Sequence, residues 1–515
     1  AGAMGGAGAM GGAGGGAAAC TLADTKCDAG LVVTCIEVNG EPAWGEATAC
    51  QTDFVCKTNA CEEASAKQQA QALVLAGYAD DLRDYTGYDQ PLDFDALKTK
   101  ATLDLYLGDG SEYFFAKAAY GIFRAVPQGH SAIGMGPLDY SQCYEPTGVA
   151  PLRGTSWYGV CARSAGQASI VTFADPQNPL GLNPGDRVVS ITRGAETWQG
   201  ADFLDRVGEE PICDGGLPSN SARADYNALH VFAVIDQGDK IEVVHPDNSS
   251  EIIDVPARGQ GIACYDPFRR AARKKFFETS QRADGVVVVI LPTLGHHSDH
   301  PFPNPLNLAS YRQWAADAIN MINADLTQYT NIQGLVWDLR GNSGGSAEYG
   351  MGIIGSLGTS GGGIGNCHAR TVASDPPTFE ASVEYPFPYQ IFVDQPLPTI
   401  QFTGKQAIVT DGIASSAADW MIYRASEMGI SIFGHASAGA YGYATGGSYV
   451  NKSIAPAAGV HGGLSSYISG AHCVDAAGVT LEGVAPITTP IDFAPIDLAA
   501  GIDTQLEAAA QYVLN

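Results

Sequence analysis

The sequence predicts an α/β layered domain from about residue 259 to the C-terminus at residue 515. Here, short apolar segments typical of buried strands alternate with segments of helical periodicity. Such alternation is typical of a sheet with helices packed against it. The predicted strands are "GVVVVILPTL", "IQGLVWDLRG", "QAIVTDG" and "GISIFGH", and the predicted helices are "SYRQWAADAINMINADL" and "SAADWMIYRASEMG".

The N-terminal 62 residues form two small segments. Residues 1–19 are glycine and alanine apart from Met4 and Met10, with two copies of "AGAMGG", so we expect a flexible tether that holds the protein off a cell surface or is only a spacer. Residues 20–62 predict a disulfide-rich module, because so short a segment needs covalent cross-links. Irregular spacing and missing histidines disfavour a metal-binding knuckle. The module resembles cysteine-rich repeats of secreted myxobacterial proteins. Its cysteines stand at positions 20, 27, 35, 50, 56 and 61.

Two regions lie between this module and the α/β domain. Residues 63–150 are predicted to be mainly helical, since "EEASAKQQAQALVLAGYADDLRDY" and "EYFFAKAAYGIFRAV" repeat apolar residues every three or four positions. Residues 151–258 alternate short β-type segments with turns, and "GLNPGDRVVSI" resembles a PDZ-domain turn and strand. This resemblance implies an inserted PDZ-like β domain that binds a peptide at its sheet edge. The insertion at about 201–228 leaves open whether the domain binds peptide or only packs on its neighbour.

The composition excludes several classes of protein. Hydrophobic residues make up 45% of the chain and charged residues 16%, which excludes a wholly disordered protein. The net charge of -27 repels phosphate backbones, so we expect no nucleic-acid partner. No apolar run approaches the ~20 residues that span a bilayer. The 12 cysteines indicate an oxidising compartment, and a start at Ala1 fits removal of a signal peptide, so we expect a secreted or cell-surface protein.

Four segments, in order, resemble motifs of the C-terminal processing peptidases, also called tail-specific proteases. They are the helical lead-in ending at "PQGHSAI", the signature "GLVWDLRGNSGGS", the serine segment "VTDGIASSAADW" and the late segment "LEGVAPITTPIDFAP". The resemblance implies a crotonase-like ββα peptidase core at 259–515. It also implies a serine-type peptidase that acts on protein or peptide substrates without a cofactor.

The serine segment places the nucleophile at Ser416, with Ser415 as the alternative one position earlier. A serine hydroxyl is a weak nucleophile until a base takes its proton. In one branch of the family that base is a lysine, but Ala440 occupies its position here, and Lys452 lies outside the motif. The chain resembles instead the serine–histidine–glutamate branch that includes tricorn protease and the chlamydial protease-like activity factor. This resemblance implies His130 as the base.

The same branch implies Glu482 as the acid that orients the imidazole. The chain has "PQGH" where the family has Asp-Gly-His, so an aspartate is missing before His130. Asp475 is an alternative acid, and His435, at the end of the strand near the site, is an alternative local base. For the oxyanion, the resemblance implies backbone N–H groups of Gly344 or Gly345 together with that of Ala417.

Two further groups of residues could bind a metal or form cross-links. The loop "GHHSDH" has zinc-ligand types, but it is rich in proline and no distant ligand is evident, so we expect no metal site. The six remaining cysteines allow fifteen connectivities, of which Cys143–Cys161, Cys213–Cys264 and Cys367–Cys473 is one. The zinc-ligand types in the loop are His296, His297, Asp299 and His300.

Together these features predict a secreted serine endopeptidase that works through an acyl-enzyme by a Ser-His-Glu mechanism. Residues 151–258 are expected to govern substrate access rather than chemistry. Two alternatives remain: a catalytically silent peptide-binding protein, and an esterase on the same fold.

The first prediction concerns the cysteines. Because they are dense in residues 20–62 and even in number beyond, we expect all of them to be oxidised. Thiol titration of denatured, unreduced protein should detect almost no free thiol. Several free thiols would contradict both the disulfide assignment and the inferred export.

Overall fold

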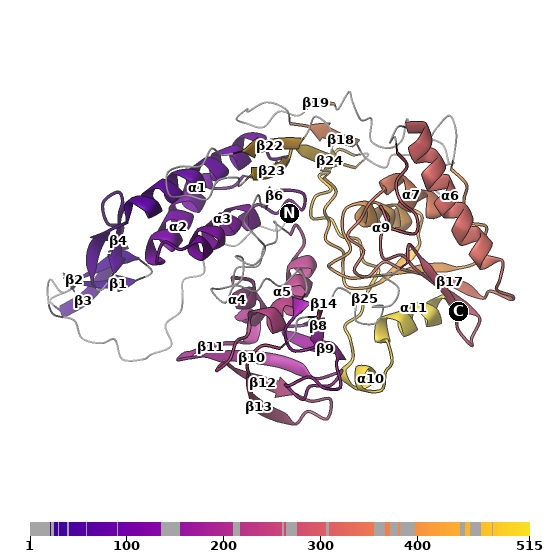
Figure 1. Ribbon diagram of the computed structural model, residues 1–515, viewed down its shortest axis with the longest axis horizontal. Helices are drawn as coiled ribbons and strands as arrows, with labels where there is room; N and C mark the ends of the chain where they lie inside the picture. Colours follow the sequence, from indigo (N-terminus) through magenta and orange to yellow (C-terminus); the bar gives the residue numbers. More distant parts are fainter. Residues whose placement is uncertain are drawn as a thin grey trace.

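The computed structural model describes residues 21, 25–28, 30–38, 41–57, 59–89, 91–134, 155–209, 217–259, 262–263, 275–304, 308–354, 366–370, 380–381, 397–442, 449–453, 465–475 and 477–515. The expected tether and Cys20, Cys143, Cys213 and Cys264 lie outside these residues. Figure 1 shows the chain running from an N-terminal module, through three helices, to a separate sheet and a larger α/β part. Within the described residues, no helix is both long and apolar enough to cross a membrane.

A mixed sheet forms the centre of the C-terminal part, as the alternating pattern predicts. Its strands follow the order β15-β16-β17-β20-β21-β25, with β15 antiparallel to β16 and the other neighbours parallel. Parallel neighbours need crossover connections, and helices lie in those from β16 to β17, from β17 to β20 and from β20 to β21. The strands are β15 (Glu278–Gln281), β16 (Val286–Ile290), β17 (Gly334–Asp338), β20 (Gln406–Thr410), β21 (Ser431–Gly434) and β25 (Thr489–Pro490).

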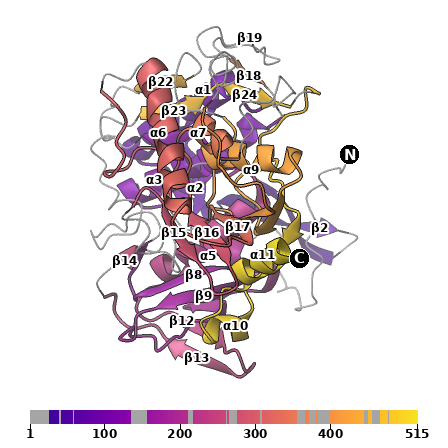
Figure 2. The ribbon, with the colours of Figure 1, turned by 90° about the vertical axis from the view of Figure 1, so that its right-hand side faces the viewer.

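Helices cover both faces of this sheet. Alternate strand residues point to opposite faces: Val287 and Trp337 join the core beneath α6 (Leu308–Leu326), α7 (Ala347–Ile353) and α9 (Ala417–Glu427). Val286 and Val336 instead pack against α11 (Thr504–Leu514). Figure 2 shows α11 on the side of the sheet away from α7 and α9. The short α10 (Pro495–Ala499) leads into α11.

Residues 155–258, here called the sheet unit, contain a second and antiparallel sheet. The order β13-β12-β10-β9-β8 places β8 at one end, and β11 pairs with β10. Helix α5 (Asn220–Val234) packs along β8 and buries Leu229 and Phe232. The other elements are β8 (Val160–Ala165), β9 (Ala168–Ala174), β10 (Arg187–Arg193), β11 (Glu196–Gln199), a 3-10 turn (Gly200–Asp202), α4 (Phe203–Glu209), β12 (Lys240–Val244) and β13 (Ser250–Asp254).

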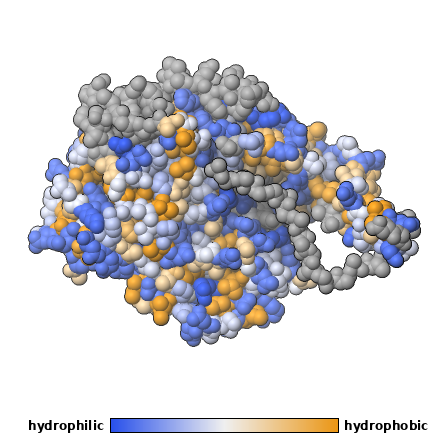
Figure 3. Space-filling view, turned by 180° about the vertical axis from the view of Figure 1, so that it is seen from behind, coloured by the Kyte–Doolittle hydropathy of each residue, from blue (hydrophilic) through white to orange (hydrophobic). Residues whose placement is uncertain are grey.

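Three helices, α1 (Ala66–Tyr85), α2 (Phe94–Leu107) and α3 (Glu112–Ala125), share one apolar core. Helix α1 starts later than its periodicity suggests, because Ser65 and Gln68 form a capping box and Glu62 and Glu63 pair in a hairpin. The N-terminal module contains β1 (Thr25–Asp28), β2 (Leu31–Val38), β3 (Glu41–Thr48), β4 (Phe54–Lys57) and β5 (Ala60–Glu63). Seen from behind, it projects at one end of the molecule (Figure 3).

Disulfides cross-link two parts of the chain. Cys27–Cys56 and Cys50–Cys61 staple the N-terminal module. The predicted pair Cys367–Cys473 is confirmed, and it joins β18 (Asn366–Ala369) to β24 (Ala471–Val474). Cys35 and Cys161 are also disulfide-bonded, and no described cysteine is free.

Three small sheets complete the described fold. Strand β18 lies between β24 and β19, strand β23 lies between β22 and β6, and β7 pairs with β14. Their bounds are β6 (Ala132–Gly134), β7 (Thr155–Ser156), β14 (Ile262–Ala263), β19 (Glu380–Ala381), β22 (Tyr449–Ser453) and β23 (Ser465–Ser469).

A buried arginine holds the end of β17 to the C-terminal helix. Arg340, 4% exposed, donates to both carboxylate oxygens of Asp338 at 3.1 and 2.6 Å, and to those of Asp503 at 2.9 and 2.6 Å. Asp503 also caps α11 by accepting the Leu506 N–H. The two carboxylates hold the pKa of Arg340 well above its usual value despite burial. This charge network fixes the loop that follows β17.

The second prediction tests this network. Asp503→Ala should lower the free energy of unfolding by on the order of 3 kcal/mol, because it leaves a buried guanidinium short of one partner. Asp254→Ala is the matched control, since Asp254 pairs with Lys240 in an exposed salt bridge and should change stability by less than about 1 kcal/mol. Chemical denaturation of both variants is the measurement. Equal losses would show that Asp503 contributes no more than a surface charge.

Candidate active site

Ser416 lies in a strained turn between β20 and α9. Its φ of 60° and ψ of -120° are unusual for a residue with a side chain. The turn is held by the Ser415 N–H, which donates to the carbonyl of Asn342 at 3.0 Å. Asp419 accepts the Ser416 N–H, and its carboxylate also accepts from Gly439 and Ala440 at 2.9 and 2.8 Å. Strain maintained by several contacts is typical of a functional position.

The structure brings His130 to Ser416 across 286 residues of sequence. The Nε2 atom of His130 lies 3.0 Å from the Oγ of Ser416. Burial lowers the pKa of His130 to about 4, so the imidazole is neutral at physiological pH and able to accept a proton. Its Nδ1 is buried and has no hydrogen-bond partner among the described residues.

Glu482 lies beside His130 without bonding to its ring. One carboxylate oxygen accepts the N–H of Gly129 at 2.9 Å, and the other accepts those of Tyr441 and Gly442, both at 3.0 Å. Burial raises the pKa of Glu482 to about 7, although the three N–H donors act in the opposite direction. The carboxylate therefore fixes the peptide group just before His130.

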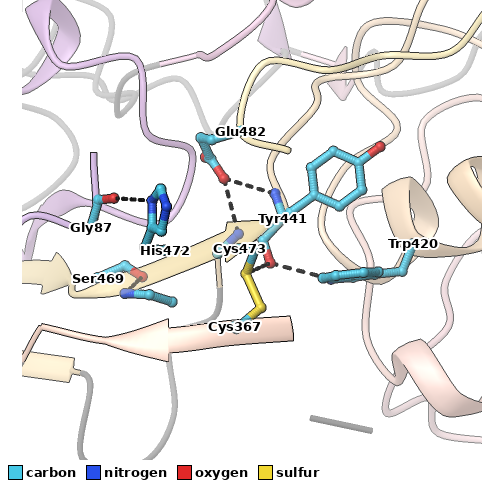
Figure 4. Close-up of a disulfide and its surroundings, with 10 residues drawn as sticks. Gly87, Cys367, Trp420, Tyr441, Ser469, His472, Cys473 and Glu482 are labelled. Carbon is cyan, nitrogen blue, oxygen red and sulfur yellow. Dashed lines mark hydrogen bonds between the residues drawn. A yellow bond between two sulfur atoms is a disulfide. The ribbon is translucent and has the colours of Figure 1, made fainter. Parts of the chain in front are cut away.

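Figure 4 shows what lies beneath Glu482. The Sγ of Cys473, in the disulfide with Cys367, is 3.4 Å from the carbonyl oxygen of Tyr441, and the indole of Trp420 donates to the same oxygen at 3.2 Å. The segment that holds Glu482 is thus anchored by the disulfide and by α9.

Position 440, where a lysine base would stand, contacts the histidine segment instead. A Cβ atom added to Gly129 would lie only 2.4 Å from the Cβ of Ala440. The backbone before His130 therefore occupies the space next to Ala440. A long side chain at position 440 would therefore clash with the backbone that leads into His130.

The glycine loop after β17 approaches Ser416 closely. A Cβ on Gly344, whose φ is +102°, would lie 2.6 Å from the Cβ of Ser416 and 3.0 Å from the Ala417 nitrogen. The Gly344 N–H is already donated to the side chain of Asn342 at 2.8 Å. Gly345 forms a parallel bridge with Leu294, but the hydrogen bonds of this bridge are made by the residues on either side of Gly345. Gly344 accepts the Leu294 N–H, and Ser346 donates its N–H to the Leu294 carbonyl, so the N–H of Gly345 itself points away from Leu294. Of the two glycines, Gly345 is therefore the better candidate for an oxyanion donor.

The alternative residues occupy other environments. His435 bonds through Nδ1 to Asp225 at 3.0 Å and through Nε2 to Asp492 at 3.0 Å, and these carboxylates raise its pKa to about 10. A protonated imidazole with both nitrogens bonded is unsuited to act as a base. Asp475 accepts N–H groups within its own turn, from Ala477 and Val479.

The histidine loop packs against the neighbouring helix α6. His300 bonds to the carbonyl of Trp314 at 3.0 Å and stacks on its indole ring. Among the described residues, no group of three or more histidine, cysteine or acidic side chains could hold a metal ion.

Sequence reasoning missed the residues that support this site. Asn342 and Asp411 lie inside the quoted motifs, and their positions in the loops that follow buried strands could have marked them. Asp411 accepts the N–H groups of Gly341, Ile413 and Ala414 at 3.0 to 3.1 Å. Asp225 lies in the segment treated as an insertion, and no local pattern distinguishes it.

Comparisons with known proteins give a family match for part of the chain and a shared fold. A sequence model described as peptidase family S41 matches residues 306–455, which include the glycine loop and Ser416. No curated protein matches the chain. Among solved structures, mature CPAF complexed with lactacystin is 11% identical with a TM-score of 0.57, over 87% of this chain and 98% of that chain.

Two other solved structures complete the comparison. The crystal structure of mature CPAF is 11% identical with a TM-score of 0.56, over 87% of this chain and 96% of that chain. The photosystem II D1 C-terminal processing protease is 14% identical with a TM-score of 0.37, over 88% and 98% of the two chains. The chain shares the fold of CPAF, and its residues 306–455 match peptidase family S41, a family of serine-type peptidases.

Proposed function

We propose that this protein is an extracytoplasmic endopeptidase that cleaves protein or peptide substrates through an acyl-enzyme on Ser416. The observation that carries the proposal is the 3.0 Å contact between Nε2 of His130 and Oγ of Ser416. A nucleophile within hydrogen-bond reach of a neutral imidazole is the arrangement that acyl transfer requires. The described disulfides support a location outside the reducing cytoplasm.

In the proposed reaction, His130 takes the Ser416 hydroxyl proton as the oxygen attacks the scissile carbonyl. The imidazolium then gives this proton to the leaving amine, and the acyl group remains on Ser416. Water attacks the acyl-enzyme in the second half, with His130 again as base, and the acid product leaves. The N–H groups of Gly345 and Ala417 stabilise the oxyanion of each tetrahedral intermediate.

Glu482 has an indirect role in this proposal. It holds the peptide N–H of Gly129 and so sets the position of His130, while its negative charge nearby favours the imidazolium that forms during reaction. This differs from a triad in which the acid bonds directly to the ring.

The third prediction tests the base and the nucleophile. Ser416→Ala, His130→Ala and the double variant should each lose on the order of ten-thousand-fold or more in kcat, because the two residues act as one unit. Hydrolysis of casein and of a small ester, measured side by side, is the readout.

His435→Ala is the control for an alternative base. If His435→Ala is inactive while His130→Ala is active, the assignment of the base is wrong. Covalent labelling by a fluorophosphonate separates an active serine hydrolase from a silent peptide-binding protein. Ester hydrolysis without casein cleavage would instead identify an esterase.

The fourth prediction concerns pH. His130 must be neutral to act as base, and with its pKa lowered to about 4 it should remain so until the pH falls near 4. Glu482, with its pKa raised to about 7, gains a proton first as the pH falls. We therefore expect kcat/KM for a fluorogenic peptide to fall in two steps, near pH 7 and near pH 4.

Glu482→Gln assigns these steps. It should lower activity and remove the step near pH 7 while leaving the lower step. A single step near the ordinary histidine pKa of about 6.5, unchanged in Glu482→Gln, would show that neither burial effect governs catalysis.

A further inference from the structure

Helix α5 of the sheet unit lies directly against the nucleophile loop, here residues 411–416. A Cβ on Gly412 would lie 2.6 Å from the carbonyl oxygen of Ser221 and 2.7 Å from the Cα of Ala222, so the two backbones touch. Ile413 packs against Cys161 of β8 and Leu229 of α5. The place where an edge strand and a helix of a PDZ-like domain would receive a peptide is thus occupied by the nucleophile loop.

Asp225 of α5 connects the sheet unit to this loop. It is fully buried, and one carboxylate oxygen accepts the N–H of Gly412 at 2.7 Å. The other accepts the N–H of Ser164 on β8 at 3.2 Å and its hydroxyl at 2.5 Å. Both oxygens also face Nδ1 of His435, at 3.0 and 3.1 Å. One carboxylate therefore joins β8, α5, the nucleophile loop and the end of β21.

A second pair of charges spans the same boundary. Arg163 of β8 lies 3.4 Å from Asp411, whose other oxygen holds the N–H groups of Ile413 and Ala414. The same oxygen accepts the N–H of Gly341, at the start of the glycine loop. Asp411 and Asp225 thus hold adjacent peptide groups of the loop that ends at Ser416.

The start of α5 also bonds to the segment that follows β21. Ser219 donates its N–H to the carbonyl of Ala438 at 3.0 Å and its hydroxyl to that of Ser437 at 2.8 Å. This segment continues to Ala440 and Tyr441, which contact Gly129 and Glu482. The sheet unit therefore contacts both loops that position the reacting groups.

We propose that Asp225 is a positioning residue for Ser416, so that the sheet unit is a working part of the active site. This inference rests on the proposed function and departs from the expectation that residues 151–258 only govern substrate access. Asp225 holds the Gly412 peptide group against the imidazolium of His435, which Asp492 balances from the other side. Separating a buried imidazolium from its buried carboxylate would leave both charges uncompensated. The pair therefore stays together and holds the loop bonded to Asp225 in place.

The experiment compares two substitutions that keep side-chain shape. Asp225→Asn removes the charge facing His435 and should lower kcat for a short fluorogenic peptide by ten- to a hundredfold, a loss expected from a small misplacement of a reacting group. KM should change less than about threefold, since the residue touches no substrate. The rate of fluorophosphonate labelling of Ser416 should fall in parallel with kcat.

Asp239→Asn is the matched control. Asp239 is also a buried carboxylate of the sheet unit, but it pairs with Arg193 and does not contact the nucleophile loop. This variant should lose stability in thermal unfolding while its kcat stays within about twofold of the wild type. The double variant Asp225→Asn/His435→Gln should recover part of the lost kcat, because it no longer leaves an unbalanced buried charge.

The outcomes separate this proposal from the one on which it rests. Equal kcat losses in Asp225→Asn and Asp239→Asn, or an unchanged kcat in folded Asp225→Asn, would overturn the positioning role and leave the Ser416 mechanism in place. If Ser416→Ala remains active, the proposed function itself fails.

Discussion

The hydrogen bond between His130 and Ser416 depends on the N-terminal helical part closing onto the C-terminal α/β part. Few covalent or local constraints bring these residues together, so non-local contacts must offset the loss of chain entropy. Strand β6, just after His130, pairs with β23, and the Ser469 N–H donates to Ser131 at 3.1 Å. Arg370 donates to the carbonyl of Thr86 at 3.1 Å, which adds a further contact between the two parts. The contact between His130 and Ser416 therefore depends on how these separate parts of the chain pack together.

Small residues make the close approach possible. Gly129 lies against Ala440, Gly344 against Ser416, and Gly412 against the first turn of α5. In each pair, a larger side chain would push apart two segments of backbone that meet at the active site. A small residue at position 440 and a histidine at position 130 go together, because the backbone before His130 packs directly against Ala440.

In the loops around Ser416, side-chain carboxylates accept backbone N–H groups that a helix or sheet would otherwise pair. These loops are irregular, so their peptide N–H groups need acceptors once water is excluded. Asp411, Asp419 and Glu482 each accept two or more such groups. Burying these negative charges is costly. Nearby buried carboxylates pair with a positive group: Asp338 with Arg340, Asp411 with Arg163, and Asp225 with the imidazolium of His435. The result is a set of loops that are rigid without being helical or extended.

The sequence by itself determined the layered α/β part, because strand and helix periodicities are local properties of the chain. It also identified Ser416, His130 and the glycine loop as candidates, through short motifs that resemble those of a known peptidase family. The tertiary structure decided which histidine meets the serine, that Glu482 bonds to the Gly129 peptide rather than to the imidazole, and that Gly344 has its N–H already engaged. It alone revealed Asp225, whose partners Gly412 and His435 are 187 and 210 residues away in the chain. Contacts over such distances depend on how separate units pack, and no local pattern of residues encodes them.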